Sequence, residues 1–144
     1  MHLRLQTDYA LRLLMHLAVA NEPLTTIAAS AKRYGISKNH LMKVAHNLVQ
    51  LGYVVSVRGR TGGLKLAKDA GAINVGAVIR ALEADAALVV CFPNGAGGCC
   101  ITPSCRLKGL LVDAEEAFYK TLDKATLNDL VVGNDDLSAI LAPA

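Results

Sequence analysis

Apolar and polar positions in the first fifty residues follow the spacing of three short amphipathic helices. Apolar side chains recur at i and i+4 over residues 9–18, which predicts a first helix that ends before Pro23. Thr25 or Thr26 can cap a second helix, and Gly35 can end it. A third helix follows directly, so the region consists of three short helices in succession.

The third helix begins at Ser37 and has one apolar and one polar face. Leu41, Val44 and Leu48 share the inner face, whereas the outward face carries cations and amides. Two helices joined by a short glycine turn form a helix-turn-helix, whose second helix can enter the major groove of DNA. The cations and amides of the outward face are suited to contact base edges and phosphates. The alternative interpretation is that this is an ordinary solvated helix face without a partner. The candidate DNA-contacting residues here are Ser37, Lys38, Asn39, His40 and Lys43.

Two strands and a glycine-rich turn come next. Residues 53–57 alternate as in a β-strand, residues 58–63 form a turn, and residues 64–66 return. A hairpin directly after a helix-turn-helix is a wing, and its glycines let the tip approach a phosphate backbone closely. A nucleotide-binding loop is the weaker alternative, because no helix follows the glycines to support a phosphate. The candidate DNA-contacting residues of the wing are Arg58, Arg60, Thr61, Gly62 and Gly63.

The second half combines a buried helix, an irregular segment and a long apolar stripe. Asn74 can cap a helix over residues 74–83, and periodicity is then lost over residues 85–104. The stripe that follows has roughly heptad spacing, which favours pairing with a second copy over packing on its own domain. Its members are Leu107, Leu110, Leu111, Ala114, Phe118 and Leu122.

These elements predict a mainly α (α+β) chain in three segments. Residues 1–84 would form a winged helix-turn-helix DNA-binding domain, and residues 85–105 a cysteine loop. Residues 106–144 would form a long C-terminal dimerisation helix and a tail. Two-fold symmetry would present two recognition helices to a palindromic site.

Charge and composition narrow the class of protein. Residues 1–68 carry ten Lys or Arg against two Asp or Glu, whereas residues 69–144 carry five against ten. The basic half suggests a polyanionic partner such as nucleic acid. The longest apolar run is seven residues, far short of the roughly 20 that a membrane-spanning helix needs. We therefore expect a cytoplasmic protein without membrane contact.

All four cysteines lie within fifteen residues, at Cys91, Cys99, Cys100 and Cys105. A structural zinc site usually shows paired C-x2-C knuckles, and a disulfide between neighbouring cysteines would be strained. A flexible loop of Gly and Pro that bears three or more thiols suits an iron–sulfur cluster. Zinc and a thiol redox switch remain the alternatives from spacing alone.

Four segments of the chain resemble the Rrf2 family of winged-helix regulators. They are residues 7–12 (TDYALR), 34–40 (YGISKNH), 57–63 (VRGRTGG) and 99–105 (CCITPSC), and the resemblance spans about residues 1–132. The likeness is greatest to the family's nitric-oxide-sensing repressor branch. It implies a homodimeric repressor that binds double-stranded DNA at a palindromic operator. It does not imply an enzyme.

The resemblance also implies an iron–sulfur cluster, 4Fe-4S in the first instance and 2Fe-2S as the alternative. Carried over by position, Cys91, Cys99 and Cys105 are its thiolate ligands, and Cys100 is a bystander. Relatives that assemble clusters have a His three residues after the last Cys, where this chain has Lys108.

Three cysteines leave one iron site of a 4Fe-4S cluster without a protein ligand. The resemblance to the nitric-oxide branch implies that Asp8 of the partner subunit is this fourth ligand. The alternative is that Asp8 only complements its helix dipole and pairs with Arg12. His16 and His46 are expected to pack or lie at the surface rather than bind metal.

The function predicted from the resemblance is a repressor that senses nitric oxide, with cluster damage releasing operator DNA. Regulators that respond to iron or cluster status, and cluster-free thiol switches, are the alternatives. An enzyme is disfavoured because the sequence has no nucleotide fingerprint or Cys-x-x-Cys motif.

Overall fold

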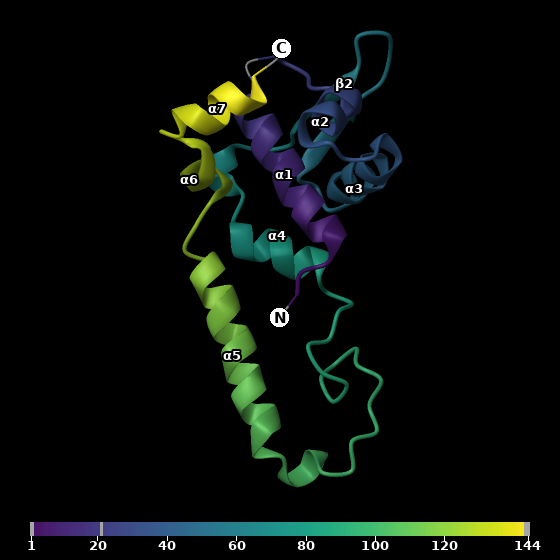
Figure 1. The fold of residues 1–144 in the computed structure, drawn as a ribbon, viewed down its shortest axis with the longest axis vertical. Helices are drawn as coiled ribbons and strands as arrows, with labels where there is room; N and C mark the ends of the chain where they lie inside the picture. The colour runs from purple at the N-terminus through teal and green to yellow at the C-terminus, as the bar shows by residue number, and fades with distance from the viewer. Residues whose placement is uncertain (1, 21, 143–144) are drawn as a thin grey trace.

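The computed structural model describes residues 2–20 and 22–142 and confirms a mainly helical chain with a small two-stranded sheet (Figure 1). The first half contains three helices, a hairpin and one 3₁₀ turn. These are α1 (Leu5–Val19), α2 (Ile27–Tyr34), α3 (Lys38–Gln50), β1 (Val54–Val57), β2 (Gly63–Leu66) and η1 (Ala70–Ala72).

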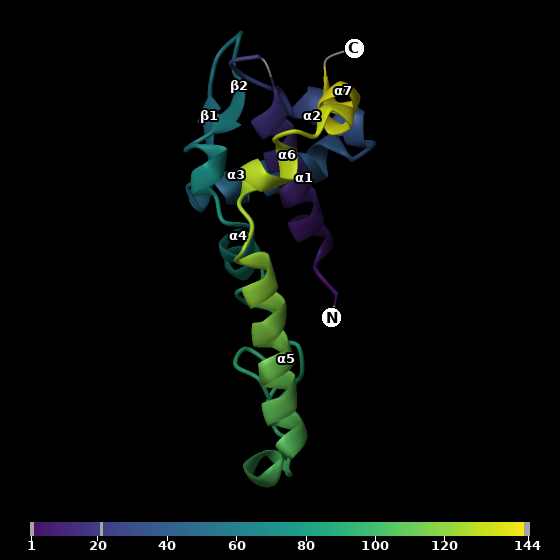
Figure 2. The ribbon, with the colours of Figure 1, turned by 90° about the vertical axis from the view of Figure 1, so that its left-hand side faces the viewer.

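The second half contains one more buried helix, the cysteine loop and three further helices. They are α4 (Val75–Leu82), η2 (Thr102–Ser104), α5 (Arg106–Leu122), α6 (Leu127–Val131) and α7 (Asp135–Leu141). The cysteine loop (residues 85–105) and α5 extend together away from the other elements and meet at η2 (Figures 1 and 2). We call these two segments the arm, and the remaining elements the body.

The helix ends of the body follow from local capping chemistry. Thr26 caps α2, because its Oγ1 accepts the Ala29 N–H at 3.1 Å, and Asn74 caps α4 through the Ala77 N–H at 2.9 Å. Gly35 ends α2 with a left-handed φ of 65°, as the sequence predicts. Ser37 occupies the N-cap position of α3 but makes no capping hydrogen bond with its side chain.

The wing is attached to the helical part through a third, very short strand contact. In the hairpin, Val54 lies opposite Leu66 and Val57 opposite Gly63. Thr25 then pairs with Leu64, with N–H···O distances of 2.9 and 2.8 Å in the two directions. Thr25 therefore ties the wing to the start of α2 and does not cap that helix.

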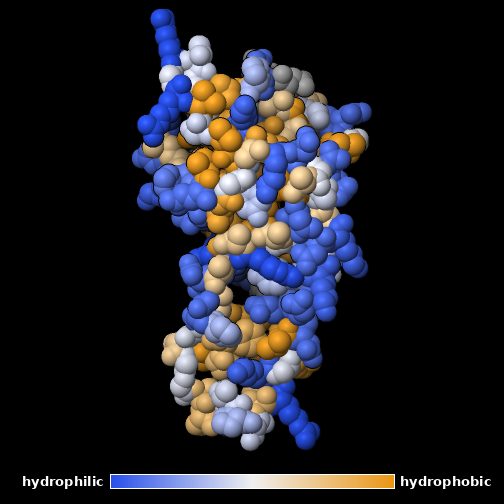
Figure 3. All heavy atoms as spheres, turned by 180° about the vertical axis from the view of Figure 1, so that it is seen from behind, coloured by the Kyte–Doolittle hydropathy of each residue, from blue (hydrophilic) through white to orange (hydrophobic). Residues whose placement is uncertain are grey.

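The hydrophobic core surrounds α1. Leu13 and Leu14 of α1 and Leu41 and Leu48 of α3 are fully buried. Helix α3, the predicted recognition helix, therefore packs directly on α1. In α4, Val75, Val78, Ile79 and Leu82 are buried as well, as expected of the buried helix predicted over residues 74–83. By contrast, α5 has no buried residue, and Figure 3 shows apolar side chains at the surface of the arm.

The residues after α5 form helices, where the sequence predicts only a tail. Thr126 and Asp129 make a reciprocal capping box at the start of α6, and Leu127 and Val131 are buried. Helices α6 and α7 return to the body and pack on α1. Their five and seven residues are too few for a clear helical period, which is why the pattern does not reveal them.

No helix in the described part of the chain is both long and apolar enough to cross a bilayer.

Candidate DNA-binding face and cysteine loop

The residues predicted to contact DNA lie at the start of α3 and at the tip of the wing. Both elements lie on the same side of α1 in Figure 1. The predicted side chains that are exposed are Ser37, Lys38, Asn39, His40 and Lys43 on α3, and Arg58, Arg60 and Thr61 on the wing. This face presents cations, a hydroxyl, an amide and an imidazole to solvent, which are groups that bind phosphates and base edges.

Gly62 and Gly63 are half-buried, and the hairpin leaves no room for a side chain at Gly62 and little room at Gly63. A Cβ on Gly62 would lie 2.3 Å from the carbonyl oxygen of Val57, and one on Gly63 would lie 3.0 Å from the Cβ of Leu24. Gly59 adopts a φ of 121°, a left-handed value that side chains rarely permit. The glycines therefore shape the wing, whatever they do on DNA.

The four cysteines are free thiols at the surface of the arm. Cys91, Cys99 and Cys105 are half-buried and Cys100 is exposed. Within residues 2–20 and 22–142, no three His, Cys, Asp or Glu side chains are positioned to hold a metal ion. The structure thus does not bring the predicted ligands together, although three thiols in one irregular segment are the donor set that an iron–sulfur cluster takes.

Cys105 and the glycines determine the local shape of the loop. Cys105 is the N-cap of α5, and its Sγ accepts the backbone N–H of Lys108 at 3.4 Å. The start of a helix favours negative charge, so this position suits a thiolate ligand. Between the first two cysteines, Asn94, Gly97 and Gly98 all have left-handed φ values, of 64°, 71° and 83°. The chain therefore turns sharply between Cys91 and Cys99.

Asp8 lies on the half-exposed face of α1 and forms an ion pair with Arg12. The distances are 2.8 Å from Arg12 Nη2 to Asp8 Oδ2 and 3.1 Å from Nε to Oδ1. The pairing expected from their i,i+4 spacing is confirmed. The role of Asp8 as a cluster ligand stays a prediction, because such a bond would come from a second subunit.

His16 is a packing residue. Its ring is buried, Nδ1 lies 2.9 Å from Ser30 Oγ, and the ring meets Tyr34 edge to face. Burial lowers the pKa of His16, because the interior disfavours the charged ring, and the Arg33 charge lowers it further. His46, in contrast, is exposed on α3.

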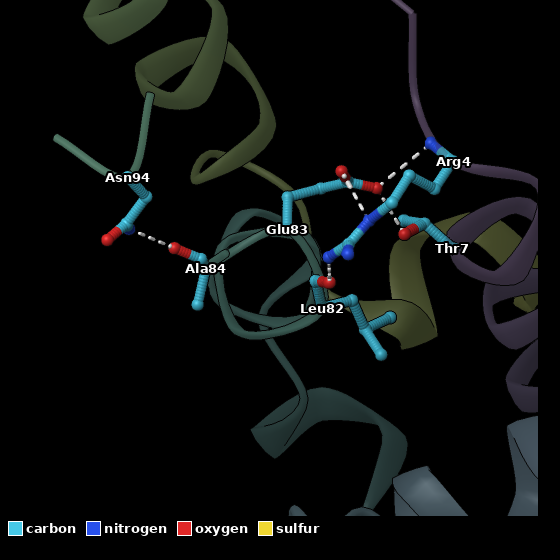
Figure 4. Close-up of polar contacts among 6 residues, drawn as sticks. All are labelled: Arg4, Thr7, Leu82, Glu83, Ala84 and Asn94. Atoms are coloured by element: carbon cyan, nitrogen blue, oxygen red, sulfur yellow. Dashed lines mark hydrogen bonds and ion pairs between the residues drawn. The ribbon is translucent and has the colours of Figure 1, made fainter. Parts of the chain in front are cut away.

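A polar junction that the sequence pattern does not predict joins α1, α4 and the cysteine loop (Figure 4). The buried Glu83 carboxylate accepts hydrogen bonds from Arg4 and Thr7, and the Arg4 guanidinium also donates to the Leu82 carbonyl. A Glu at the end of an amphipathic helix is ordinarily solvated, so nothing in the sequence signals its burial.

A helix-turn-helix with an exposed polar recognition face and a hairpin beside it defines a winged-helix transcriptional regulator. The comparisons with known proteins specify the kind. The family model Rrf2, described as "Iron-dependent Transcriptional regulator", matches residues 3–133. The chain belongs to the Rrf2 family of transcriptional regulators, which is a non-enzymatic class.

Within this family the chain is similar to proteins named "HTH-type transcriptional regulator NsrR". That of Oceanobacillus iheyensis is 44% identical over 142 residues, with 98% of this chain and 97% of the relative covered. That of Bacillus subtilis (strain 168) is 47% identical over 137 residues, covering 94% and 93%.

Solved structures agree with this assignment. Staphylococcus aureus CymR superposes with a TM-score of 0.70 at 25% identity, covering 90% of this chain and 97% of that one. The structure titled T. potens IscR gives 0.69 at 26% identity, covering 90% and 85%.

Proposed function

We propose that this chain is a homodimeric, DNA-binding repressor that senses nitric oxide through an iron–sulfur cluster. Its proposed ligands are Cys91, Cys99, Cys105 and the partner subunit's Asp8. The observation that carries the proposal is the grouping of three half-buried thiols in one irregular segment, outside a complete winged-helix body. The similarity to the NsrR regulators supports the role in transcriptional regulation, and the signal follows from the resemblance of the sequence motifs to the nitric-oxide-sensing branch.

On the DNA side, the exposed cations have the longest reach. Lys38, Lys43, Arg58 and Arg60 would bind phosphates, whereas Asn39 and His40 would read base edges. Ser37, Thr61, Gly62 and Gly63 would lie against the backbone of the duplex. A two-fold symmetric protein requires a palindromic operator for two such faces.

The surface of α5 supports the homodimer. This helix has no buried residue, and Leu107 and Leu110 are 60% and 66% exposed. Val90 and Ile101 of the cysteine loop are exposed as well. Apolar side chains in roughly heptad positions are buried when a second α5 packs against them.

In the proposed response, the state of the cysteines controls the body. When bound, a 4Fe-4S or 2Fe-2S cluster supplies iron that reacts with nitric oxide. Three thiolates bound to one group hold the cysteine loop in a single arrangement, and the partner's Asp8 joins that loop to the partner's α1. Loss of these bonds frees the loop and α1, so the two recognition helices no longer match the operator.

A regulator of iron or cluster status is the second candidate, because the matching family model is described as iron-dependent. It would use the same ligands and the same DNA face, and it would differ in its signal. Free thiols fit the reducing cytoplasm under either proposal.

The test is an anaerobic preparation assayed for iron, sulfide and DNA binding. The probe is a duplex selected from a random pool by the coloured protein. We expect a few equivalents of nitric oxide to bleach the visible absorption and release the duplex. We expect Cys105→Ser to remove the colour, whereas Cys100→Ser, the matched control, keeps both colour and response. A coloured protein that ignores nitric oxide and loses its cluster under iron limitation would favour the second candidate, and a protein that cannot be reconstituted would exclude both.

The DNA face is tested by salt dependence on the same duplex. Arg60→Ala should reduce the slope of log K against log salt by about two units, because one phosphate contact is lost in each subunit of the dimer. Lys120→Ala, on the exposed surface of α5, is the control and should leave the slope unchanged. An unchanged slope for Arg60→Ala would remove the wing from the interface.

A further inference from the structure

Glu83 is a buried charge with an unusual set of partners (Figure 4). Its side chain is only 7% exposed. Its carboxylate accepts the backbone N–H of Arg4 at 3.0 Å, the Arg4 Nε–H at 3.1 Å and the hydroxyl of Thr7. A buried carboxylate persists only when it is paired and hydrogen-bonded in this way, so its position is closely determined.

These partners are the N-cap residue and a first-turn residue of α1. Arg4 is the N-cap residue of that helix and makes no capping hydrogen bond with its own side chain. Glu83 supplies negative charge there from the end of α4, where the helix dipole of α1 favours it. The beginning of α1 is therefore held by a residue 79 positions later in the chain.

On its other side Glu83 adjoins the cysteine loop. Asn94, which lies between Cys91 and Cys99, donates from Nδ2 to the carbonyl of Ala84 at 2.8 Å. Ala84 directly follows Glu83, so this bond joins the loop to the end of α4, on the side away from the Glu83 carboxylate (Figure 4). Asp8 directly follows Thr7, and α1 packs on α3 along the core. Contacts thus run without a gap from the cysteine loop to the recognition helix.

We propose that Glu83 is a positioning residue that transmits the arrangement of the cysteine loop to α1, and through α1 to α3. The proposal rests on the function proposed above, in which the loop has two arrangements. When the loop moves, the Asn94–Ala84 bond moves the end of α4, and the carboxylate then shifts the start of α1. Glu83 binds no cluster and no DNA itself.

The experiment measures the ratio of operator affinities of the cluster-loaded and cluster-free forms. For the wild type we expect a ratio of about 5- to 150-fold, the usual range of coupling between two sites. Glu83→Gln keeps the shape but removes the charge, and Thr7→Val removes one hydroxyl. Each should reduce the ratio by about threefold or more. Thr7→Ser restores the hydroxyl and should restore the ratio, and Asp85→Asn, an exposed carboxylate two positions away, should leave it unchanged.

A second measurement uses the cluster-free chain and separates transmission from folding. Hydrogen exchange at the first amides of α1 should be faster by about tenfold in Glu83→Gln, while the core of α3 keeps its protection. If the variants weaken both forms equally, Glu83 only stabilises the fold and the proposal is overturned. If Glu83→Gln lowers the iron content, Glu83 is a ligand, and the proposal is again overturned. A wild type whose affinity does not depend on the cluster would refute the proposed function itself, before any variant is made.

Discussion

The body and the arm of this protein differ in how many of their apolar side chains are buried within one chain. In the body, α1 and α3 bury whole leucine side chains, and the helix ends are capped by Thr26 and Asn74. In the arm, α5 runs for 17 residues without a buried side chain, and among the described residues the cysteines are part of no group that could hold a metal ion. The body is complete as a single chain, whereas the arm requires further contacts to become so.

The two parts meet at a joint made by α4 and the end of α5. Arg80 lies 2.8 Å from Asp123 and 3.8 Å from Glu116, and its guanidinium covers the Tyr119 ring at 4.2 Å. Gly76 permits this approach, since a Cβ there would lie 2.0 Å from the Asp123 carboxylate. The C-terminal end of α5 is thus fixed on α4, and the exposed apolar side chains lie toward the N-terminal end of α5.

The largest expected effect is the loss of the proposed dimer when a charge is added to the N-terminal half of α5. Leu110→Asp places a carboxylate in the proposed interface once in each subunit. At about 2 kcal/mol per subunit, the dimer dissociation constant should rise about a thousandfold. Sedimentation equilibrium measures this change, and circular dichroism should show an unchanged body.

Val112→Asp is the matched control. Val112 is also exposed on α5, but two positions along a helix bring it to the opposite side from Leu110. It should leave the dimer intact. Dissociation by both variants, or by neither, would contradict the predicted interface and with it the contrast between body and arm.

The body should instead respond to a cavity. Leu48→Ala empties a fully buried position beside α1 and should lower the free energy of unfolding by about 2–5 kcal/mol. Leu48→Met nearly conserves the volume and should cost less than about 1.5 kcal/mol. Urea unfolding of the cluster-free, reduced protein measures both values. Equal costs would mean that α1 and α3 are loosely packed and that the body is no more complete than the arm.

The sequence predicts the body better than the arm for a physical reason. Helices α1 to α4 and the wing have enough turns, caps and glycines to produce a clear period, and Gly35 and Asn74 mark their ends correctly. The exposure of α5 follows from its heptad stripe. The positions of the cysteines cannot be derived in this way, because under the proposed function they would depend on a bound cluster and a second subunit.

Two features of the body also lie beyond the pattern. The short α6 and α7 take their stability from packing on α1, and their main local signal is the capping box of Thr126 and Asp129. The burial of Glu83 depends on Arg4 and Thr7, which are distant in sequence. Tertiary contacts of this kind have no periodic signature.

The smallest expected effect is a pH dependence of the body that is centred on His16. This ring lies between Ser30 and α7, and its pKa is lowered from 6.5 by burial and then by Arg33, with a backbone hydrogen bond to Leu141 acting in the opposite direction. The unfolded chain therefore binds a proton at a higher pH than the folded chain does. The contribution of His16 to stability is present above pH 6.5 and is lost as the pH falls toward the lowered pKa.

His16→Gln should remove this dependence. Urea unfolding of the cluster-free protein at pH 7.5, 6.5 and 5.5 gives the difference in unfolding free energy between wild type and variant. The other histidines are common to both proteins, so the change in this difference with pH reports His16 alone. The difference should shrink below pH 6.5. A constant difference for His16→Gln would mean that the ring is solvated in the folded chain. Helix α7 would then not cover it, and the body would be no better packed than the arm at this end.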